Sequence, residues 1–374
     1  MDFEFNESEQ AVAQLARQIL DGHTTNELLK QHERSGDPFD AALWKALGDA
    51  DLLGIAVPQE HGGSGLGFLA LCLLLQEIGR AVAPVPAYAA LVCGALPLAR
   101  FSEDPLAHEL LSKIALGTCI VTAGLSEPGT SDPFVPTTRV DGTGSGARLT
   151  GVKSAVPYAE QSTHVLVPAV DAAGTIGVFC VETSGDGVTL TPQPSSDGLP
   201  HAQVELDGAA AVLELSGADG ATIVRWIVEH AIAARCMMQL GVTERALEMT
   251  GAYSRERIQF DRPIGSFQAV HQRAADAYIE VDAIRLTSWE AVWRLANELP
   301  ASQHVMVAKY VAAEGGQFAA YACQHLHGGI GIDVDYPLHR YFKWATKIEH
   351  ELGSARHQLD RLGREIALNG IQVL

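Results

Sequence analysis

The sequence contains no apolar run long enough to span a membrane. Its most apolar stretch, Phe68 to Leu75, is far shorter than the roughly 20 residues that a membrane-spanning helix requires. A basic N-terminal region is also missing, because the segment from Met1 to Glu4 is acidic, whereas a secretory signal begins with positive charge. These absences predict a cytoplasmic protein.

Basic side chains are scarce. The chain has 26 Lys and Arg residues against 45 Asp and Glu residues, and its formal net charge is -19. A surface with this excess of negative charge repels the phosphate backbone of DNA or RNA. The composition therefore argues against a nucleic-acid-binding protein.

The sequence has no Cys-x-x-Cys pair. Its six cysteines are scattered over positions 72, 93, 119, 180, 236 and 323. Scattered cysteines in an intracellular chain mostly behave as small buried hydrophobic residues. We therefore assign them no redox or metal-binding role.

The residues that are present predict a well-buried globular chain. Hydrophobic residues make up 47% and charged residues 19% of the 374 positions, a length that favours two or three packed units. Apolar residues recur at helical spacing between Val12 and Leu20, and a second helix is expected after Pro38. A turn-rich stretch at 58–65 interrupts this pattern. Helical patterns then resume at 66–81, after Pro86 and at 104–116.

The pattern changes near Thr118. Short apolar runs separated by Gly, Asp and Pro continue to about Ala211, which is typical of a compact β unit. The glycine-rich piece at 141–146 has the composition of a phosphate loop, but no helical pattern follows it, so a hairpin turn is the favoured interpretation. Four helical segments follow, at 221–257, 267–298, 301–327 and 335–369, with a break expected near Gly353.

This order predicts an α+β multidomain fold. We expect an N-terminal all-α domain at 1–117, a central β-barrel or sandwich domain at 118–215, and a C-terminal four-helix bundle at 216–374. Helices as long and apolar as those of the last domain need several packing partners, so oligomerisation through the bundle is also expected.

The most specific motif lies between Arg255 and Gln268. The segment reads Arg-Glu-Arg-Ile-Gln-Phe-Asp-Arg-Pro-Ile-Gly-Ser-Phe-Gln. Arg257 carries a permanent charge on a planar donor suited to a pyrophosphate, and Gln268 has an amide suited to hydrogen-bonding a nucleotide. The alternative is an Arg-rich helix end exposed to solvent.

Three further motifs occur along the chain, in the order that one protein family shows. They are Glu60 to Leu66, the stretch Leu-Ser-Glu-Pro-Gly-Thr-Ser-Asp that contains Ser126, and Leu-His-Gly-Gly-Ile-Gly around Gly328 and Gly329. Together with the motif above, they resemble the acyl-CoA dehydrogenase family over nearly the whole chain. The similarity is to the actinobacterial type, including subunits of α2β2 heteromeric acyl-CoA dehydrogenases.

The resemblance implies the cofactor and the residues that contact it. It implies FAD, bound by the C-terminal bundle that also builds a dimer or tetramer. The residues that it assigns to cofactor binding are Arg257, Gln259, Phe260, Phe267, Gln268, His325, Gly328, Gly329 and Ser126. In the family, an acyl-CoA is the substrate and an electron-transferring flavoprotein is the usual electron acceptor.

His325 and His327 suggest a metal site at first sight. Two histidines two positions apart on a helix point in different directions, and no Cys or carboxylate constellation accompanies them. We therefore predict no metal. By resemblance, His325 takes the place of a nucleotide-binding Gln.

The catalytic base expected of the family is missing from its usual place. The family reaction needs a carboxylate within hydrogen-bond reach of the substrate α-carbon. Counting from Pro337 places that Glu at Leu352, which has no titratable group, and the adjacent Glu351 is rotated by about 100° on a helix. Other members carry the base on the first long bundle helix, where it aligns with Ala231, two positions from Glu229. The catalytic residue therefore stays unassigned.

The segment expected to face the flavin departs from the family as well. The family pattern Gly-x-Lys-x-Trp/Phe-Ile-Thr uses the aromatic ring to pack on the flavin and the Thr hydroxyl to bond N5. In this sequence Ala155 replaces the aromatic residue and Pro157 replaces the Thr. Proline has neither a hydroxyl nor an N–H group.

These departures suggest a divided active site. In the family, one FAD spans a dimer interface, and this chain keeps the nucleotide-binding residues while the flavin side has changed. The resemblance thus implies FAD-dependent α,β-dehydrogenation of an acyl-CoA, with this chain as the complementary subunit of an α2β2 enzyme for bulky thioesters, as in steroid side-chain degradation. The alternatives are a self-sufficient homotetramer using Glu351 or Glu229, a flavin-dependent monooxygenase on the same scaffold, and a non-catalytic scaffold subunit.

Overall fold

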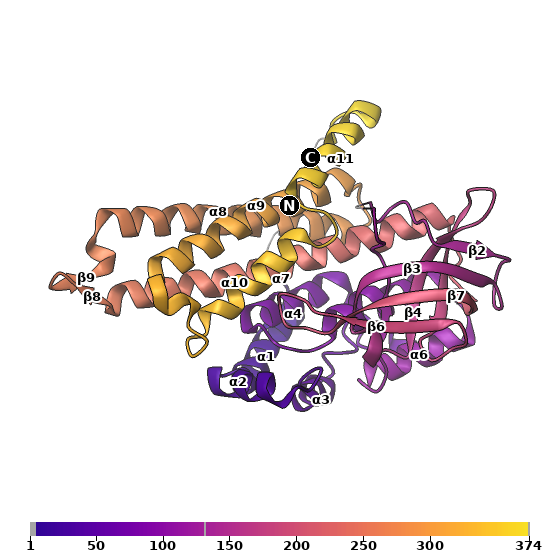
Figure 1. Cartoon of the computed structure of the whole chain (residues 1–374), viewed down its shortest axis with the longest axis horizontal. Helices are drawn as coiled ribbons and strands as arrows, with labels where there is room; N and C mark the ends of the chain where they lie inside the picture. Colours follow the sequence, from indigo (N-terminus) through magenta and orange to yellow (C-terminus); the bar gives the residue numbers. More distant parts are fainter. Residues whose placement is uncertain (1–4, 131, 373–374) are drawn as a thin grey trace. The chain divides into compact units, whose positions relative to one another are not determined.

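The computed structural model describes residues 5–130 and 132–372, which form two compact units. We call them the β unit (Met1–Ile19, His32–Leu71 and Pro84–Ala231) and the bundle unit (Leu20–Gln31, Cys72–Ala83 and Ile232–Leu374). The α-helices are α1 Glu7–His23, α2 Asn26–Ser35, α3 Ala41–Asp49, α4 Gly67–Ala81, α5 Leu96–Phe101, α6 Pro105–Ala115, α7 Gly220–Glu256, α8 Gln268–Ala296, α9 Ser302–His327, α10 Leu338–His350 and α11 Ala355–Asn369 (Figure 1).

The N-terminal helices follow the apolar periodicity, with one difference. The predicted second helix is α3, and it begins where the Asp40 carboxylate accepts the Leu43 N–H at 2.9 Å, a side-chain cap that satisfies one free helix donor. The structure adds α2, which the sequence pattern did not reveal because Leu29 is its only buried residue. The apolar segment after Pro86 forms a π-helix, Tyr88–Ala95, whose eight residues are all buried.

A seven-stranded sheet forms the centre of the β unit. Its strands are β1 Val121–Ala123, β2 Arg139–Asp141, β3 Arg148–Pro157, β4 His164–Val170, β5 Ile176–Glu182, β6 Val188–Gln193 and β7 His201–Glu214. Strand β5 pairs with both β4 and β7, and β2 pairs with both β3 and β4, so five strands close into a barrel that has no open edge among them. The glycine-rich piece at 141–146 connects the antiparallel strands β2 and β3, which confirms the hairpin.

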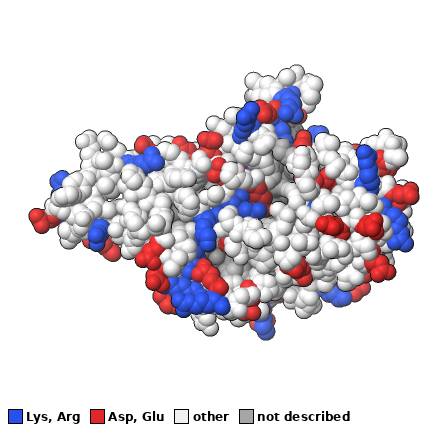
Figure 2. All heavy atoms as spheres, viewed as in Figure 1, with Lys and Arg blue, Asp and Glu red and all other residues white. Residues whose placement is uncertain are grey.

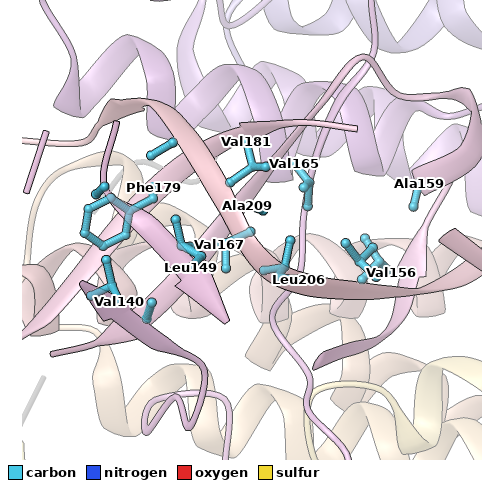
Figure 3. Close-up of a cluster of buried hydrophobic side chains, with 14 of the residues drawn as sticks. Val140, Leu149, Val156, Ala159, Val165, Val167, Phe179, Val181, Leu206 and Ala209 are labelled. Atoms are coloured by element: carbon cyan, nitrogen blue, oxygen red, sulfur yellow. The ribbon is translucent and has the colours of Figure 1, made fainter. Parts of the chain in front are cut away.

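Alternating apolar side chains fill the barrel. Figure 3 shows Val165 and Val167 of β4, Phe179 of β5 and Leu206 of β7 gathered with their neighbours on the inner face. Each of the four is no more than 3% exposed. This packing holds β3 in place, and β3 contains the segment that was expected to face a flavin.

The bundle unit consists of long helices. Helices α8 and α9 run side by side (Figure 1), and α10 and α11 also pack on α9. The break predicted near Gly353 separates α10 from α11, where Leu352 and Gly353 have φ of 56° and 99°. The fully buried Lys309 ammonium of α9 donates to the carbonyls of Ile348 and Glu349, which caps the end of α10. Burial lowers the pKa of Lys309 to about 8.

The sequence also led to expectations about the cysteines, membrane-spanning helices and domain boundaries. All six cysteines are buried free thiols, which confirms their expected place in the core. In the described part of the chain, no helix is both long and apolar enough to cross a membrane. The α+β architecture is confirmed, while the domain boundaries at 117 and 215 stay predictions.

Two glycines allow α4 and α7 to cross closely within the bundle unit. A Cβ at position 241 would lie 1.9 Å from the Gln76 carbonyl oxygen, and a Cβ at position 79 would lie 2.2 Å from that of Met238. Both distances are far inside van der Waals contact, and the obstacle is backbone rather than a flexible side chain. The crossing therefore requires glycine on both helices.

We expect Gly241→Ala to lower the free energy of unfolding by about 1–3 kcal/mol, because the helices must move apart to admit the methyl group. Urea denaturation measures this change. The matched control is Gly363→Ala on α11, where a Cβ meets nothing within 4 Å. That control should raise stability by roughly 0.5–1 kcal/mol. Equal midpoints for Gly241→Ala and the unsubstituted chain would contradict the close crossing.

Candidate functional site

The predicted nucleotide-binding motif forms an exposed hairpin after α7. Strands β8 Ile258–Gln259 and β9 Arg262–Pro263 pair antiparallel, and the turn residues Phe260 and Asp261 have φ of 52° and 64°. The Gln259 amide donates to the Ile258 carbonyl at 2.7 Å. Phe260 is 87% exposed at the tip of this hairpin, and Ile258 of β8 is 59% exposed.

Arg257 lies at the base of this hairpin with its backbone fixed. Its N–H donates to the Tyr253 carbonyl at 2.8 Å, and its carbonyl accepts the Ile264 N–H at 2.8 Å. The side chain is exposed, and no carboxylate in the described ranges pairs with its guanidinium. A fixed backbone and an uncommitted guanidinium fit a phosphate group supplied by a ligand.

Phe267 and Gln268 begin α8 on the other side of the hairpin. The Arg262 guanidinium lies 4.2 Å from the centre of the Phe267 ring, and the Phe260 ring meets that ring edge-on at 6.1 Å. Gln268 is the first residue of α8 and is exposed. The structure thus brings five predicted residues, Arg257, Gln259, Phe260, Phe267 and Gln268, to one end of the bundle unit.

His325, Gly328 and Gly329 lie at the end of α9, in the same unit. All three are exposed, and nothing lies within 4 Å of a Cβ placed on either glycine. The Gly328 N–H donates to the carbonyls of Gln324 and His325, so its amide closes the helix. The open surface of the glycines, rather than the Gly328 amide, is therefore what a ligand would meet.

Ser126 belongs to the β unit. Its carbonyl accepts the Ser154 N–H of β3 at 2.9 Å, and its neighbour Glu127 forms a buried ion pair with Lys153 of the same strand. The Lys153 ammonium also donates to the Pro168 carbonyl at 2.7 Å. These bonds attach the segment around Ser126 to the barrel.

The segment of β3 expected to face a flavin has its donors engaged within the chain. The Ala155 N–H donates to the Gln193 side chain at 2.7 Å, and the Tyr158 N–H donates to the Pro200 carbonyl at 2.9 Å. Pro157 has no N–H, and its carbonyl accepts the Thr122 hydroxyl at 2.8 Å. Tyr158 is only 3% exposed. These occupied donors and Pro157 leave the β-unit segment few backbone groups for a flavin.

Glu351, the alternative base, forms an ion pair within the bundle unit. Its carboxylate pairs with Arg235 at 2.9 Å, and the two side chains are 10% and 5% exposed. Removing Glu351 from this pair to reach a substrate would leave a buried charge uncompensated, which typically costs about 3–5 kcal/mol. Leu352 and Ala231, where the family base would align, are buried apolar residues. Glu229 is half-buried on α7.

The charged side chains of one face and the potential metal ligands of the described residues were the remaining candidates for a site. In Figure 2, acidic and basic side chains are interspersed over the visible face. Over residues 5–130 and 132–372, no three His, Cys, Asp or Glu side chains are placed to hold a metal ion. His325 is exposed, whereas the His327 ring is buried with its Nδ1 bonded to the Cys323 carbonyl at 2.8 Å, so the two side chains diverge.

Sequence reasoning missed several residues that shape these regions. Gln193 and Arg235 contact their partners Ala155 and Glu351 across 38 and 116 positions of sequence, so no local pattern could reveal them. Lys153 carried a local signal, because it stands two positions from Gly151 and Ala155 in a predicted β segment, and a lysine that is buried there needs a counter-charge.

Two family models match the sequence. They are the Acyl-CoA dehydrogenase, N-terminal domain, at residues 6–118, and the Acyl-CoA dehydrogenase, C-terminal domain, at residues 218–367. Acyl-CoA dehydrogenase FadE27 of Mycobacterium tuberculosis (strain ATCC 25618 / H37Rv) is 38% identical over 377 residues, covering 98% of this chain and 99% of that protein. FadE28 of the same organism is 32% identical over 368 residues, with coverage of 98% and 100%.

Solved structures give the same result. A chain of the ChsE4-ChsE5 complex from Mycobacterium tuberculosis matches with a TM-score of 0.92 and 39% identity, covering 98% of this chain and 99% of that chain. A chain of the Tcur3481-Tcur3483 steroid ACAD G363A variant matches with a TM-score of 0.91 and 39% identity, with coverage of 97% and 98%.

Proposed function

Because the chain belongs to the acyl-CoA dehydrogenase family of oxidoreductases, we propose that it is the complementary subunit of a heteromeric, FAD-dependent acyl-CoA dehydrogenase. The observation that carries this proposal is the contrast between the two halves of the site. The side chains predicted to bind the nucleotide are exposed in the bundle unit, apart from the half-buried Phe267. In the segment predicted to face the flavin, Gln193 and Pro200 accept the N–H groups of Ala155 and Tyr158, and Pro157 has no N–H. Leu352 stands where we predict the base of the family to align.

The residues of this chain would bind and orient the nucleotide half of the cofactor. Arg257 would hold the pyrophosphate by charge-assisted hydrogen bonds, and Gln259 and Gln268 would bond neighbouring polar groups. Phe260 and Phe267 would cover the cofactor with apolar surface. His325, Gly328 and Gly329 would form the floor of the nucleotide-binding surface. Ser126 stays a predicted contact on the flavin side. The chemistry that bound FAD would supply is an acceptor for the hydride of the substrate β-carbon.

The remaining chemistry must come from a partner subunit. Dehydrogenation of an acyl-CoA requires a base for the α-proton, and neither Leu352 nor Ala231 has a titratable side chain. We infer an α2β2 tetramer in which a second acyl-CoA dehydrogenase subunit supplies the base and the flavin pocket. Two similar structures support this inference, because they are described as a ChsE4-ChsE5 complex and a Tcur3481-Tcur3483 steroid enzyme. A bulky CoA thioester as substrate and an electron-transferring flavoprotein as acceptor complete the proposal.

Flavin content tests the divided site. We expect the chain purified alone to be folded and to retain little FAD, because its own flavin-facing donors are occupied. Co-expression with the partner subunit should yield one FAD per pair of chains and dehydrogenase turnover with an acceptor dye. Visible absorbance measures both. One FAD per chain together with turnover by the chain alone would overturn the proposal in favour of a self-sufficient enzyme.

The Arg235–Glu351 ion pair disfavours the self-sufficient enzyme, because it engages the carboxylate that is adjacent in sequence to Leu352. A non-catalytic scaffold is disfavoured by Arg257, because its guanidinium is exposed and no carboxylate among the described residues pairs with it. No described contact favours a monooxygenase over a dehydrogenase.

A further inference from the structure

Three aromatic side chains meet beside the nucleotide-binding residues, in the bundle unit. We call Tyr253 of α7, His327 of α9 and Tyr336 before α10 the aromatic clamp. The Tyr253 and His327 rings stack at 4.5 Å with an angle of 18°, and the Tyr336 ring lies 5.2 Å from the imidazole and 6.4 Å from the Tyr253 ring. The clamp joins the ends of two long helices.

Hydrogen bonds fix the orientation of the central imidazole. His327 Nδ1 lies 2.8 Å from the Cys323 carbonyl, which can only accept, so Nδ1 carries the proton. His327 Nε2 then accepts the Tyr336 hydroxyl at 3.1 Å. The ring is 4% exposed, and burial lowers the pKa of His327, which favours this neutral form. Both nitrogens of the clamp histidine are therefore satisfied in one tautomer only.

Each member of the clamp is attached to a segment assigned to the nucleotide. The Tyr253 carbonyl accepts the Arg257 N–H at 2.8 Å, which sets the start of the hairpin. His327 directly precedes Gly328, and its imidazole accepts the Tyr336 hydroxyl; the Tyr336 N–H donates to the Asp333 carbonyl at 3.0 Å, in the turn that follows the glycine-rich segment. Within the glycine-rich segment Gly328–Ile332, a Cβ at Gly331 would lie 3.1 Å from the His327 Cβ. A movement of the imidazole would thus displace both ligand segments.

We infer that Tyr253, His327 and Tyr336 are positioning residues, which fix Arg257 relative to the Gly328–Gly329 surface so that both can contact a nucleoside diphosphate. The inference rests on the proposed function and extends it to residues that do not themselves need to touch the cofactor. The competing explanation is ordinary core packing, in which loss of the clamp would lower stability without a specific effect on nucleotide affinity.

The test uses ADP as a probe of the nucleotide half and the full-length chain, with dissociation constants from titration calorimetry or ligand-observed NMR. Tyr336→Phe removes only the hydroxyl and keeps the ring. We expect it to raise the dissociation constant for ADP by at least about threefold, the effect of one lost hydrogen bond. His327→Leu should have a larger effect. Adding Tyr336→Phe to His327→Leu should change nothing more, because the hydroxyl has already lost its acceptor.

Tyr341→Phe is the matched control. Tyr341 is a buried tyrosine of α10 whose hydroxyl donates to the Arg80 carbonyl at 3.0 Å, so its replacement removes a comparable bond in the same unit. We expect similar urea midpoints for the Tyr336→Phe and Tyr341→Phe variants, but weaker ADP binding only for the first. Equal ADP affinity in all variants, or an equal loss in both tyrosine variants, would overturn the clamp and leave the proposed function standing. Failure of the unsubstituted chain to bind ADP would overturn the nucleotide role itself, and the clamp with it.

Discussion

Replacing Lys153 by methionine is expected to destabilise the β unit by about 3–5 kcal/mol, because it leaves the buried Glu127 carboxylate without its cation. The Lys153 and Glu127 side chains are only 1% and 4% exposed. Glu127 also accepts the N–H and hydroxyl groups of Thr137 and Thr138, so it is held in place and unable to turn toward water. Urea denaturation followed by circular dichroism measures the loss.

The double variant Lys153→Met/Glu127→Gln is the control. It removes both charges and should recover part of the stability, because no buried ion is left unpaired. A surface pair such as Lys113–Glu109, which is more than half exposed on both sides, provides the comparison, and Lys113→Met should change stability little. A loss for Lys153→Met no greater than that for Lys113→Met would show that the buried pair contributes nothing specific.

The same pair predicts a pH dependence. Burial alone would raise the pKa of the Glu127 carboxyl, but the Lys153 ammonium and the bonds from Thr137 and Thr138 outweigh burial and hold that pKa at about 2, below the ordinary value of 4.5. A folded-state pKa below the unfolded value means that the contribution to stability is present above pH 4.5 and is lost as the pH falls toward 2. The Glu127→Gln variant should lack this part of the acid profile.

Replacing Arg257 by alanine is expected to weaken FAD binding by the assembled enzyme by roughly 10- to 150-fold. A hydrogen bond to a charged group is worth about 1.5–3 kcal/mol, and no other cation is assigned to the pyrophosphate. Arg257→Lys keeps the charge but loses the planar two-pronged donor, so an intermediate loss is expected. Titration of the apo-complex with FAD, monitored by flavin fluorescence, gives the affinities.

Arg255→Ala is the matched control for Arg257. Arg255 is exposed two positions earlier, on the last turn of α7, and carries the same side chain. We expect it to leave FAD affinity almost unchanged, since it is not among the residues assigned to the cofactor. Full FAD occupancy in the Arg257→Ala complex would support the scaffold alternative, because a scaffold needs no phosphate contact from this chain.

Much of the fold could be predicted because its signals are local. Apolar residues at helical spacing revealed α7, α8 and α9 with bounds within two residues, and the break near Gly353 lies where φ turns positive. The sequence pattern did not predict helix α2, because only one of its side chains is buried and it therefore lacks an apolar face. The domain boundaries and the individual cofactor contacts remain predictions.

The sequence by itself determined the family and excluded position 352 as the base. A leucine at position 352 excludes acid–base chemistry there in any conformation, because the side chain has no titratable group. Likewise, Pro157 excludes a backbone donor wherever the strand lies. Such conclusions depend on the chemical identity of one residue and need no coordinates.

Only the tertiary structure decided which groups remain available for a ligand. Arg235 pairs with the Glu351 carboxylate, and Gln193 accepts the Ala155 N–H. Tyr253 and Tyr336, which are more than 70 positions apart, both contact His327. These contacts join residues distant in sequence, and a hydrogen bond requires its partners within about 3 Å. Whether a donor is occupied or available therefore depends on how the chain folds back on itself, which composition and local pattern do not determine.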